Sequence, residues 1–378
     1  MSNEASEKRT ALYDTHERLG AHFTDFGGWQ MPLRYGSEVA EHRAVREQAG
    51  LFDLSHMGEI DIRGAAAERF LDHALVGKFS GIAVGRAKYS LICDDDGGVI
   101  DDLIGYRLAD DRFLVVPNAG NSDTVAAALA ARAEGFEVTV TDQSTTTALI
   151  AVQGPTAEAL LVSLVAEAEA QRIRDLRYYR AMDTVVAGHA VLLARTGYTG
   201  EDGFELFVAS TDAAALWASL EQAGSEHGLT PCGLACRDSL RLEAGMPLYG
   251  NELSRERSPF EAGLGPVVAL TKPDGFVGQA ALQQLADAGS GTSSGQRLVG
   301  LRGAGRRAPR AGYAVVDGDT TLGVVTSGQP SPTLGYPIAM AYVDVDRTNL
   351  GDQLGVDIRG TVEKFTVVEL PFYKRSRS

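Results

Sequence analysis

A short stretch rich in glycine and serine, ADAGSGTSSGQ at residues 286–296, is the feature that most constrains the fold of this chain. Such a composition is typical of a flexible linker. Before it, helix and strand patterns alternate, whereas residues 297–374 contain mostly short strand patterns separated by glycine and proline turns. The sequence therefore predicts a long N-terminal region, a linker, and a small C-terminal β-barrel or sandwich.

The region before the linker predicts an α+β fold in which helices pack on antiparallel sheets. Residues 37–50 begin with a capping serine and end with a terminal glycine, which indicates a helix, and residues 65–75 carry a helical apolar stripe. Residues 88–119 indicate a three-stranded antiparallel meander, and residues 190–208 a hairpin with a long glycine-rich loop. Because no regular strand–helix–strand series is present, a doubly wound parallel sheet is not expected.

The charge of the chain argues against nucleic acid and anionic membranes as partners. Its 378 residues include 50 acidic and 35 basic side chains, for a formal net charge of −15, whereas phosphate contacts need clustered Lys and Arg. Most basic residues are arginines, because lysine occurs only at Lys8, Lys78, Lys88, Lys272, Lys364 and Lys374. An acidic, lysine-poor surface indicates a halophilic protein adapted to a salt-rich cytoplasm, where salt screens like charges. The alternative is an ordinary acidic protein of a mesophile.

The three cysteines, Cys93, Cys232 and Cys236, form no CxxC pair. Neither a disulfide framework nor a structural zinc site is therefore expected. The first twenty residues lack the apolar segment of a signal peptide, and no stretch reaches the roughly 20 apolar residues of a membrane span. We therefore expect a cytoplasmic protein.

Two adjacent carboxylates, Asp101 and Asp102, interrupt an apolar run that predicts a strand. Strand side chains alternate between two faces, and this alternation places Asp102 with Ile104 and Tyr106 in the more uniformly apolar set. Burying an unpaired carboxylate is costly, so a carboxylate kept on that face indicates a pocket. The alternative is a sheet edge or a bulge that turns Asp102 to solvent.

Three further polar side chains are candidates for a binding site. Glu205 lies on the strand face opposite Phe204 and Leu206, where it either lines a cleft or is an ordinary half-exposed glutamate. Arg237 and Arg241 lie four residues apart on a predicted helix. They form either a solvated pair or a fork that binds a carboxylate or a polar heterocycle.

Two tyrosines, Tyr89 and Tyr198, occur where the meander and the glycine-rich loop are positioned to flank one cavity; ordinary core packing is the alternative. The sequence contains no GxSxG nucleophile motif, no phosphate-binding glycine motif and no cluster of residues at metal-ligand spacing. His56 is isolated, which is more typical of a structural role. These residue types suit a polar planar ligand better than a hydrolytic centre.

Taken in order, several motifs resemble the aminomethyltransferase family, the T proteins of the glycine cleavage system. The motifs are DFGGWQMPLRY (25–35), GLFDLSHMGEI (50–60), KYSLICDDDGGVIDDLIGY (88–106), ALIAVQGP (148–155), RTGYTGEDGFEL (195–206), CGLACRDSLRLEAGMPLYGNEL (232–253) and TSGQPSPTLGYPIAMAYV (326–343). They span nearly the whole chain. The resemblance implies a three-lobed arrangement around a central cavity. Residues 8–285 would form a folate-binding region of two lobes, and residues 297–374 the C-terminal barrel domain.

The resemblance also implies a reaction. The methylene of an aminomethyl group, held on the dihydrolipoyl arm of the H protein, would pass to tetrahydrofolate. Ammonia would be released and 5,10-methylenetetrahydrofolate formed. Tetrahydrofolate is thus the expected cosubstrate, no metal or covalent cofactor is expected, and the partners are the lipoylated H protein and the P and L proteins of the system.

Carried over position by position, the resemblance implies a catalytic role for Asp102, the second aspartate of the IDDL motif. It implies that Glu205 accepts hydrogen bonds from the pterin and that Arg237 holds the polar cosubstrate or orients the acidic residues. The cavity-lining positions that it implies are Met57, Tyr89, Tyr106, Tyr198 and, less directly, Tyr178.

Two other interpretations stay open at this point. One is a stand-alone folate-dependent demethylase of the same superfamily; an oxidase with an attached flavin domain is not expected, because the chain has no GxGxxG segment. The other is a non-catalytic folate-binding scaffold. Retention of the IDDL, GFEL and ACRDSLRLEAG motifs counts against the scaffold.

Overall fold

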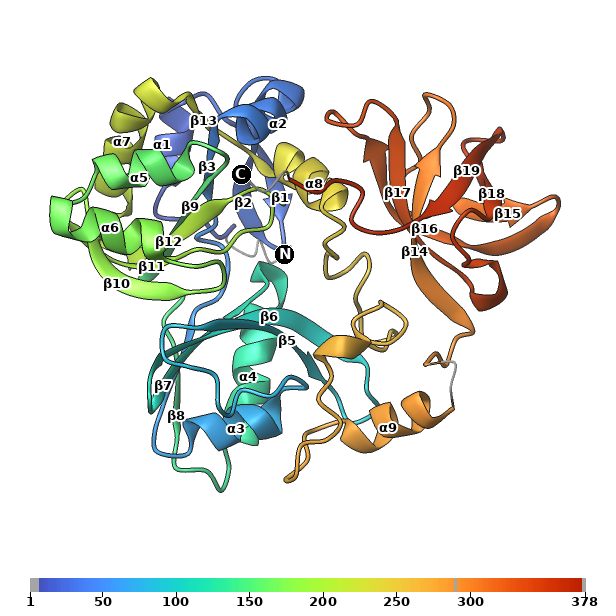
Figure 1. Cartoon of the computed structure of the whole chain (residues 1–378), viewed down its shortest axis with the longest axis horizontal. Helices are drawn as coiled ribbons and strands as arrows, with labels where there is room; N and C mark the ends of the chain where they lie inside the picture. The colour runs from blue at the N-terminus through green and yellow to red at the C-terminus, as the bar shows by residue number, and fades with distance from the viewer. Residues whose placement is uncertain (1–6, 289–290, 376–378) are drawn as a thin grey trace, which may run out of the picture. The chain divides into compact units, whose positions relative to one another are not determined.

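The computed structural model describes residues 7–288 and 291–375 of the chain (Figure 1). It divides into two compact units, each built from three separate segments. Of the described residues, the first unit contains 7–67, 82–88 and 104–238, and the second contains 68–81, 89–103 and those from 239 onward. Within the described residues, no helix is both long enough and apolar enough to cross a bilayer.

A six-stranded sheet forms the centre of the first unit, in the order β10-β11-β12-β9-β3-β13. Neighbouring strands are antiparallel except for β13, which runs parallel to β3. The strands are β3 (Ala49–Asp53), β9 (Thr147–Gln153), β10 (Ala181–Val186), β11 (His189–Ala194), β12 (Gly203–Ala209) and β13 (Leu229–Pro231). The predicted hairpin is confirmed as the β11–β12 pair.

One apolar core joins this sheet to helices α5 (Ala157–Ser163), α6 (Glu167–Asp175) and α7 (Ala213–Gly224). Leu160 and Trp217 from the helices and Phe204 from β12 are fully buried in it. Burial of each such side chain is worth about 1.5–3 kcal/mol. The core therefore fixes β12, the strand that carries Glu205.

The N-terminal part of the first unit contains a two-stranded sheet and two helices. These elements are α1 (Tyr13–Arg18), β1 (His22–Phe26), β2 (Trp29–Arg34) and α2 (Glu38–Glu47). The oxygen of Ser37 accepts a hydrogen bond from the Ala40 amide and caps α2, as the sequence predicted.

The predicted end of this helix at Gly50 is wrong. Gly50 belongs to β3, where a Cβ would lie 2.4 Å from Cγ2 of Val45 and 2.9 Å from Sγ of Cys232. Close packing against these side chains, and not the termination of a helix, requires a glycine there.

A five-stranded sheet has the order β5-β6-β7-β4-β8, and the division between the two units passes through β5 and β6. The strands are β4 (Ile60–Arg63), β5 (Ala87–Cys93), β6 (Val99–Ala109), β7 (Arg112–Pro117) and β8 (Thr139–Asp142), and the helices nearest in sequence are α3 (Ala67–Ala74) and α4 (Ser122–Arg132). The predicted meander is confirmed as β5-β6-β7.

The C-terminal part of the second unit is a closed barrel of strands β14-β17-β16-β15-β18-β19, drawn in orange to red in Figure 1. The strands are β14 (Gln296–Gly303), β15 (Ala314–Asp317), β16 (Thr320–Pro330), β17 (Pro337–Asp344), β18 (Gln353–Asp357) and β19 (Val362–Val368). Its interior holds buried side chains such as Leu301, Val325 and Phe365. The predicted C-terminal β-barrel is confirmed.

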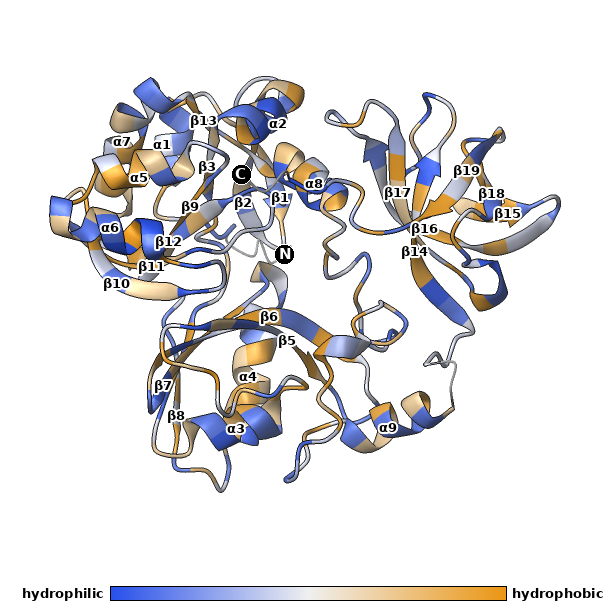
Figure 2. Cartoon of the chain, viewed as in Figure 1, coloured by the Kyte–Doolittle hydropathy of each residue, from blue (hydrophilic) through white to orange (hydrophobic). Residues whose placement is uncertain are grey.

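The remaining helices are α8 (Leu234–Glu243) and α9 (Gln279–Asp287), with short 3-10 turns at Ala119–Asn121, Ser210–Asp212, Ser225–His227, Gly265–Val267 and Val345–Arg347. Helix α9 contains both apolar and polar residues (Figure 2), and its Leu282 is fully buried. Within the second unit, Nζ of Lys272 donates a hydrogen bond of 2.7 Å to the carbonyl of Asp72 and a further one to the carbonyl of Leu75.

The predicted linker, residues 286–296, begins inside α9 and ends at the first residue of β14. Residues 289 and 290 of it lie outside the described residues. After them, the Thr292 hydroxyl and the Ser294 amide donate hydrogen bonds of 3.0 and 3.1 Å to Oε1 of Glu261.

Candidate functional site

In the first unit, Glu205 is held by two hydroxyl groups from other segments. Its neighbours on the adjacent strands are Ala151 and Ala194, whose small side chains leave room beside it. Thr196, in the loop after β11, donates a hydrogen bond to Oε2 of Glu205, and the hydroxyl of Tyr106 on β6 donates one of 3.3 Å to the same oxygen. The structure thus joins two predicted site residues, Tyr106 and Glu205, directly. Thr196, which was not predicted, binds the same carboxylate oxygen.

The electrostatics of Glu205 follow from this arrangement. The residue is only 8% exposed, and burial raises the pKa of its carboxyl. The hydrogen bond from Thr196, the charge of Arg237 and the hydrogen bond from Tyr106 act in the opposite direction. Both hydroxyls bind Oε2, so among the described residues none donates to Oε1. Oε1 therefore remains an acceptor for a ligand.

The glycine-rich loop that carries Thr196 is fixed by Gln153 of β9. Nε2 of Gln153 donates to the carbonyl of Thr196 at 3.0 Å, and Thr199 donates to Oε1 of Gln153 at 2.9 Å. At Gly197 and Gly203, a Cβ would lie only 1.9 and 2.5 Å from atoms of the Gln153 amide. The loop needs glycine at these two places because the amide packs directly against its backbone.

Arg237 lies in the first turn of α8, where its guanidinium centre is 4.8 Å from the ring centre of Tyr198. This distance is that of a cation–π contact. Burial lowers the pKa of the guanidinium, and Tyr198 and Glu205 oppose the shift. Two further predicted site residues are therefore in contact.

Arg241 has a different role from Arg237. Its guanidinium is 1% exposed and donates to Oε2 of Glu252 at 2.8 Å and to the Ser327 hydroxyl at 2.7 Å. The interpretation of Arg237 and Arg241 as a solvated pair is wrong, because Arg241 forms a buried ion pair with Glu252 inside the second unit.

Met57 and His56 lie in the turn that follows β3. The Met57 amide donates to the carbonyl of Leu54 at 2.9 Å, and the Met57 side chain is half-buried. His56 is 2% exposed and meets Phe26 edge-to-face at 5.6 Å between ring centres. Burial lowers the pKa of His56 to about 4, with Asp53 opposing and Arg237 adding to the shift, so the imidazole is neutral at physiological pH.

In the second unit, Tyr89 of β5 and Asp102 of β6 are joined by a hydrogen bond of 3.0 Å from the Tyr89 hydroxyl to Oδ2 of Asp102. Alternation placed Asp102 on the more apolar face of the strand, but the opposite face of β6 is the more buried one. Asp101 is 0% exposed and shares the more buried face of β6 with Val99 and Leu103, whereas Asp102 is partly exposed. The alternation of side chains along a strand predicts which residues share a face, but it does not predict which of the two faces packs against the core.

The remaining candidate, Tyr178, is 48% exposed and packs edge-to-face on Tyr179 at 4.9 Å between ring centres. Among the residues that the structure describes, no group of three or more His, Cys, Asp or Glu side chains is arranged to hold a metal ion.

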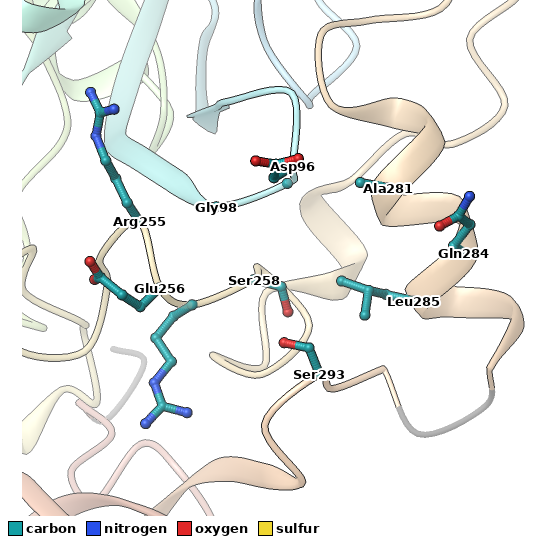
Figure 3. Close-up of a pocket in the computed structure, with 11 residues that line it drawn as sticks. Asp96, Gly98, Arg255, Glu256, Ser258, Ala281, Gln284, Leu285 and Ser293 are labelled. Atoms are coloured by element: carbon teal, nitrogen blue, oxygen red, sulfur yellow. The ribbon is translucent and has the colours of Figure 1, made fainter.

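A pocket of about 300 Å³ in the second unit contains none of the predicted site residues (Figure 3). It is formed by the turn before β6, the segment around Glu256, one face of α9 and Ser293. Its lining residues are Asp96, Gly97, Gly98, Arg255, Glu256, Arg257, Ser258, Ala281, Gln284, Leu285 and Ser293.

Comparison with known proteins agrees with the fold described above. Residues 12–272 match the family model described as "GCVT N-terminal domain", and residues 296–374 match "Glycine cleavage T-protein C-terminal barrel domain". Both domains of a glycine cleavage T protein are therefore present in one chain.

Full-length relatives carry the same assignment. A protein of Cutibacterium acnes named "Aminomethyltransferase" is 56% identical, with 98% of this chain and 99% of the relative covered. A protein of the same name from Saccharopolyspora erythraea is also 56% identical, with 98% and 100% covered. The crystal structure of glycine cleavage system aminomethyltransferase T from Bartonella henselae superposes with a TM-score of 0.88 at 35% identity, covering 98% of this chain and 99% of that one.

The matches define a transferase with the two-domain organisation of a glycine cleavage T protein. The chain belongs to the aminomethyltransferase family. The predicted fold class and the predicted enzymatic function are confirmed.

Proposed function

We propose that this enzyme transfers the methylene of an aminomethyl group, carried by the dihydrolipoyl arm of the H protein, to tetrahydrofolate. Ammonia leaves, and 5,10-methylenetetrahydrofolate and the dihydrolipoyl H protein remain. The observation that carries this proposal is the 56% identity to relatives named "Aminomethyltransferase" over 98% of the chain. Within this proposal, residues 8–285 form the folate-binding region and residues 297–374 the barrel domain.

Glu205 is assigned to the pterin of tetrahydrofolate. Two hydroxyls hold Oε2, so the carboxylate keeps a defined direction and Oε1 can accept hydrogen bonds from a ligand. A carboxylate that accepts hydrogen bonds from N–H groups suits the polar edge of a pterin. Tyr106 lies beside it and packs edge-to-face on Phe207 at 5.6 Å between ring centres, which supports its assignment as a wall of the same binding position.

Asp102 is assigned as the catalytic carboxylate. Its charge would stabilise the positive charge that develops on the transferred carbon as the bond to sulfur breaks. The hydrogen bond from Tyr89 supports this role, because it fixes the direction of one carboxylate oxygen. The partial exposure of Asp102 also supports it, since a reacting group must be reachable.

Arg237, Tyr198 and Met57 are assigned to contacts with the cosubstrate. The cation–π contact between Arg237 and Tyr198 holds the guanidinium and the ring in fixed positions. Met57 offers a flexible apolar side chain from the turn after β3. Together these groups supply one charged, one aromatic and one apolar surface, which is the combination that a substituted pterin requires.

The partners assigned to the enzyme are the lipoylated H protein and the P and L proteins of the system. We place the reaction in the cytoplasm. The net charge of −15 supports the absence of nucleic acid and membrane from this set, because the phosphates of both would be repelled.

We also propose that the enzyme is halophilic. Its support is the excess of acidic over basic residues and the scarcity of lysine. Thermal unfolding in 0.1 M and about 2 M KCl tests this, because molar salt reduces the screening length to roughly 3 Å and removes self-repulsion. A melting temperature that does not rise relative to an equally concentrated non-acidic control protein would favour an ordinary acidic enzyme.

The function itself is tested by tetrahydrofolate-dependent release of ammonia from aminomethylated H protein, at low and at molar KCl. Wild type is measured beside Asp102→Asn. Release by wild type and its near loss in the variant would support both the transferase activity and the role of the carboxylate.

Two alternatives give different results in the same assay. A stand-alone demethylase would bind tetrahydrofolate and release no ammonia, and it would instead convert methylated amine or sulfur donors. A non-catalytic scaffold would bind tetrahydrofolate and turn over neither kind of donor.

A further inference from the structure

Three arginines of the first unit, Arg86, Arg177 and Arg180, gather on one surface without acidic partners. Arg86 and Arg177 are exposed and Arg180 is partly exposed. Among the described residues, no carboxylate forms an ion pair with any of the three. In a chain with 50 acidic and 35 basic residues, unpaired positive charge at one place needs an explanation. We call this set the arginine surface.

The backbone forces two of these arginines together. Arg86 and Arg180 lie directly opposite each other in an isolated antiparallel bridge. The amide of Ala181 donates to the carbonyl of Gly85 at 2.8 Å, and the amide of Ala87 donates to the carbonyl of Tyr179 at 2.9 Å. Directly opposed residues point to the same side, and like charges at such positions destabilise the pair. Placing two guanidinium groups there therefore costs stability in the isolated chain.

The turn between Arg177 and Arg180 adds to this cost. Tyr179 has a φ of +61°, a left-handed conformation that an aromatic residue rarely adopts. Its carbonyl and amide are fixed on both sides, because the Tyr179 amide donates to the carbonyl of Arg195 at 2.9 Å. The neighbouring Tyr178 is turned outward and is 48% exposed.

Two arginines of the arginine surface, Arg177 and Arg180, line a pocket of about 330 Å³. The pocket is lined by Val84, Gly85, Asp175, Leu176, Arg177, Arg180 and Ala181. Leu176 and Ala181 are buried, whereas Val84 is 48% exposed. Asp175, the acidic residue of the lining, accepts a hydrogen bond of 3.0 Å from Gln171. The surface thus combines two unpaired arginines with exposed apolar and aromatic side chains, the residue types enriched where proteins bind each other.

We propose that the arginine surface docks a carboxylate-rich surface of the lipoylated H protein. The proposal rests on the proposed function, which makes that protein the carrier of the substrate. Charge complementarity supports it: in an enzyme with a net charge of −15, these arginines are a local excess of positive charge, which attracts carboxylates of a partner while the acidic remainder repels them. Guanidinium groups bind carboxylates through paired hydrogen bonds, which would orient the partner as well as attract it.

The test is charge reversal in the double variant Arg177→Glu/Arg180→Glu. The matched control is Arg43→Glu/Arg69→Glu, which changes the net charge equally at exposed arginines of α2 and α3 that form no ion pair with a carboxylate of the described residues. For wild type and both variants, we would measure kcat, the KM for aminomethylated H protein, the KM for tetrahydrofolate and the melting temperature. Direct binding of H protein is measured by calorimetry.

We expect the Kd and KM for H protein to rise roughly tenfold or more in Arg177→Glu/Arg180→Glu, because an attraction is replaced by a repulsion. The KM for tetrahydrofolate, kcat at saturating H protein and the melting temperature should match those of the control. The rise in KM should shrink as KCl is added, because salt screens both attraction and repulsion.

Three outcomes overturn the proposal. An unchanged KM for H protein, or an equal rise in the control, removes the arginine surface from docking. A rise confined to the KM for tetrahydrofolate assigns the arginines to the carboxylates of the folate. A change in sedimentation coefficient without a change in H-protein binding assigns them to contact with a second copy of this chain. A wild type that binds H protein but releases no ammonia instead contradicts the proposed function.

Discussion

The hydroxyl of Tyr89 lies 3.0 Å from Oδ2 of Asp102, across the hairpin formed by β5 and β6. The tyrosine is the donor, so the carboxylate oxygen has one fixed direction. The structure therefore joins two residues that were proposed on separate grounds, one as an aromatic wall and the other as the catalytic carboxylate.

Replacing Asp102 with asparagine should lower kcat by roughly a hundredfold or more, because the charge that stabilises the developing cation is lost while the shape is kept. Binding of tetrahydrofolate, measured by fluorescence titration, should change little. Equal turnover in variant and wild type would remove Asp102 from the mechanism.

Tyr89→Phe should lower kcat by about tenfold, because the variant removes only the hydroxyl that directs Asp102. The measurement is a double-mutant cycle with Asp102→Asn, followed by single-turnover kinetics. If Tyr89 acts through Asp102, its substitution has little further effect once Asp102 is asparagine. Additive effects would show that Tyr89 has an independent role.

Thr196→Val should raise the KM for tetrahydrofolate by roughly tenfold, because Glu205 loses one of the two donors that orient it. Thr196→Ser keeps the hydroxyl and serves as the control. The Thr196 hydrogen bond also lowers the pKa of Glu205 against the effect of burial. Its loss should therefore move the acid limb of the pH profile of kcat/KM to higher pH, and an unmoved limb would contradict the assignment of Glu205.

Glu59→Gln should stabilise the fold at alkaline pH. Glu59 is fully buried and neither of its carboxylate oxygens has a hydrogen-bond partner among the described residues; burial, with Asp142 adding, raises its pKa well above the usual value. The pKa of Glu59 is higher in the folded state than in the unfolded state. Its contribution to stability is therefore complete at a pH below the unfolded-state pKa, and it is lost as the pH rises through the folded-state pKa.

The expected gain in the free energy of unfolding at high pH is about 1–3 kcal/mol. Urea unfolding at pH 5 and pH 9 measures it, and the gain should be smaller at pH 5. A gain of equal size at both values would show that the ionisation of Glu59 is not its cause.

Much of the fold was predictable because it depends on local patterns. The serine that caps α2, the meander and the short strands of the barrel each follow from residues close in sequence. Gly50 shows where this fails. Its small size is required by Val45 and by Cys232, which comes from a distant part of the chain, so a local pattern mistook a packing glycine for a helix end.

The site was predictable only in part, for the same physical reason. Resemblance to the family selected Glu205 and Asp102, but alternation assigned the buried face of β6 to the wrong aspartate. Thr196 was missed because its role depends on Tyr106, 90 residues earlier in the chain. One available signal was the position of Thr196 in the glycine-rich loop, two residues after β11, whose last residue, Ala194, pairs with Glu205.

The contact of Lys272 with the carbonyl of Asp72 has a consequence for synthesis on the ribosome. The two residues are 200 positions apart, so the segment around Asp72 emerges long before its partner exists. At about 5–20 residues per second, the wait is roughly 10–40 seconds. During that interval the segment between Glu68 and Gly81 has no complete second unit to join. The nascent chain must stay soluble through that delay without the contacts that hold the finished enzyme.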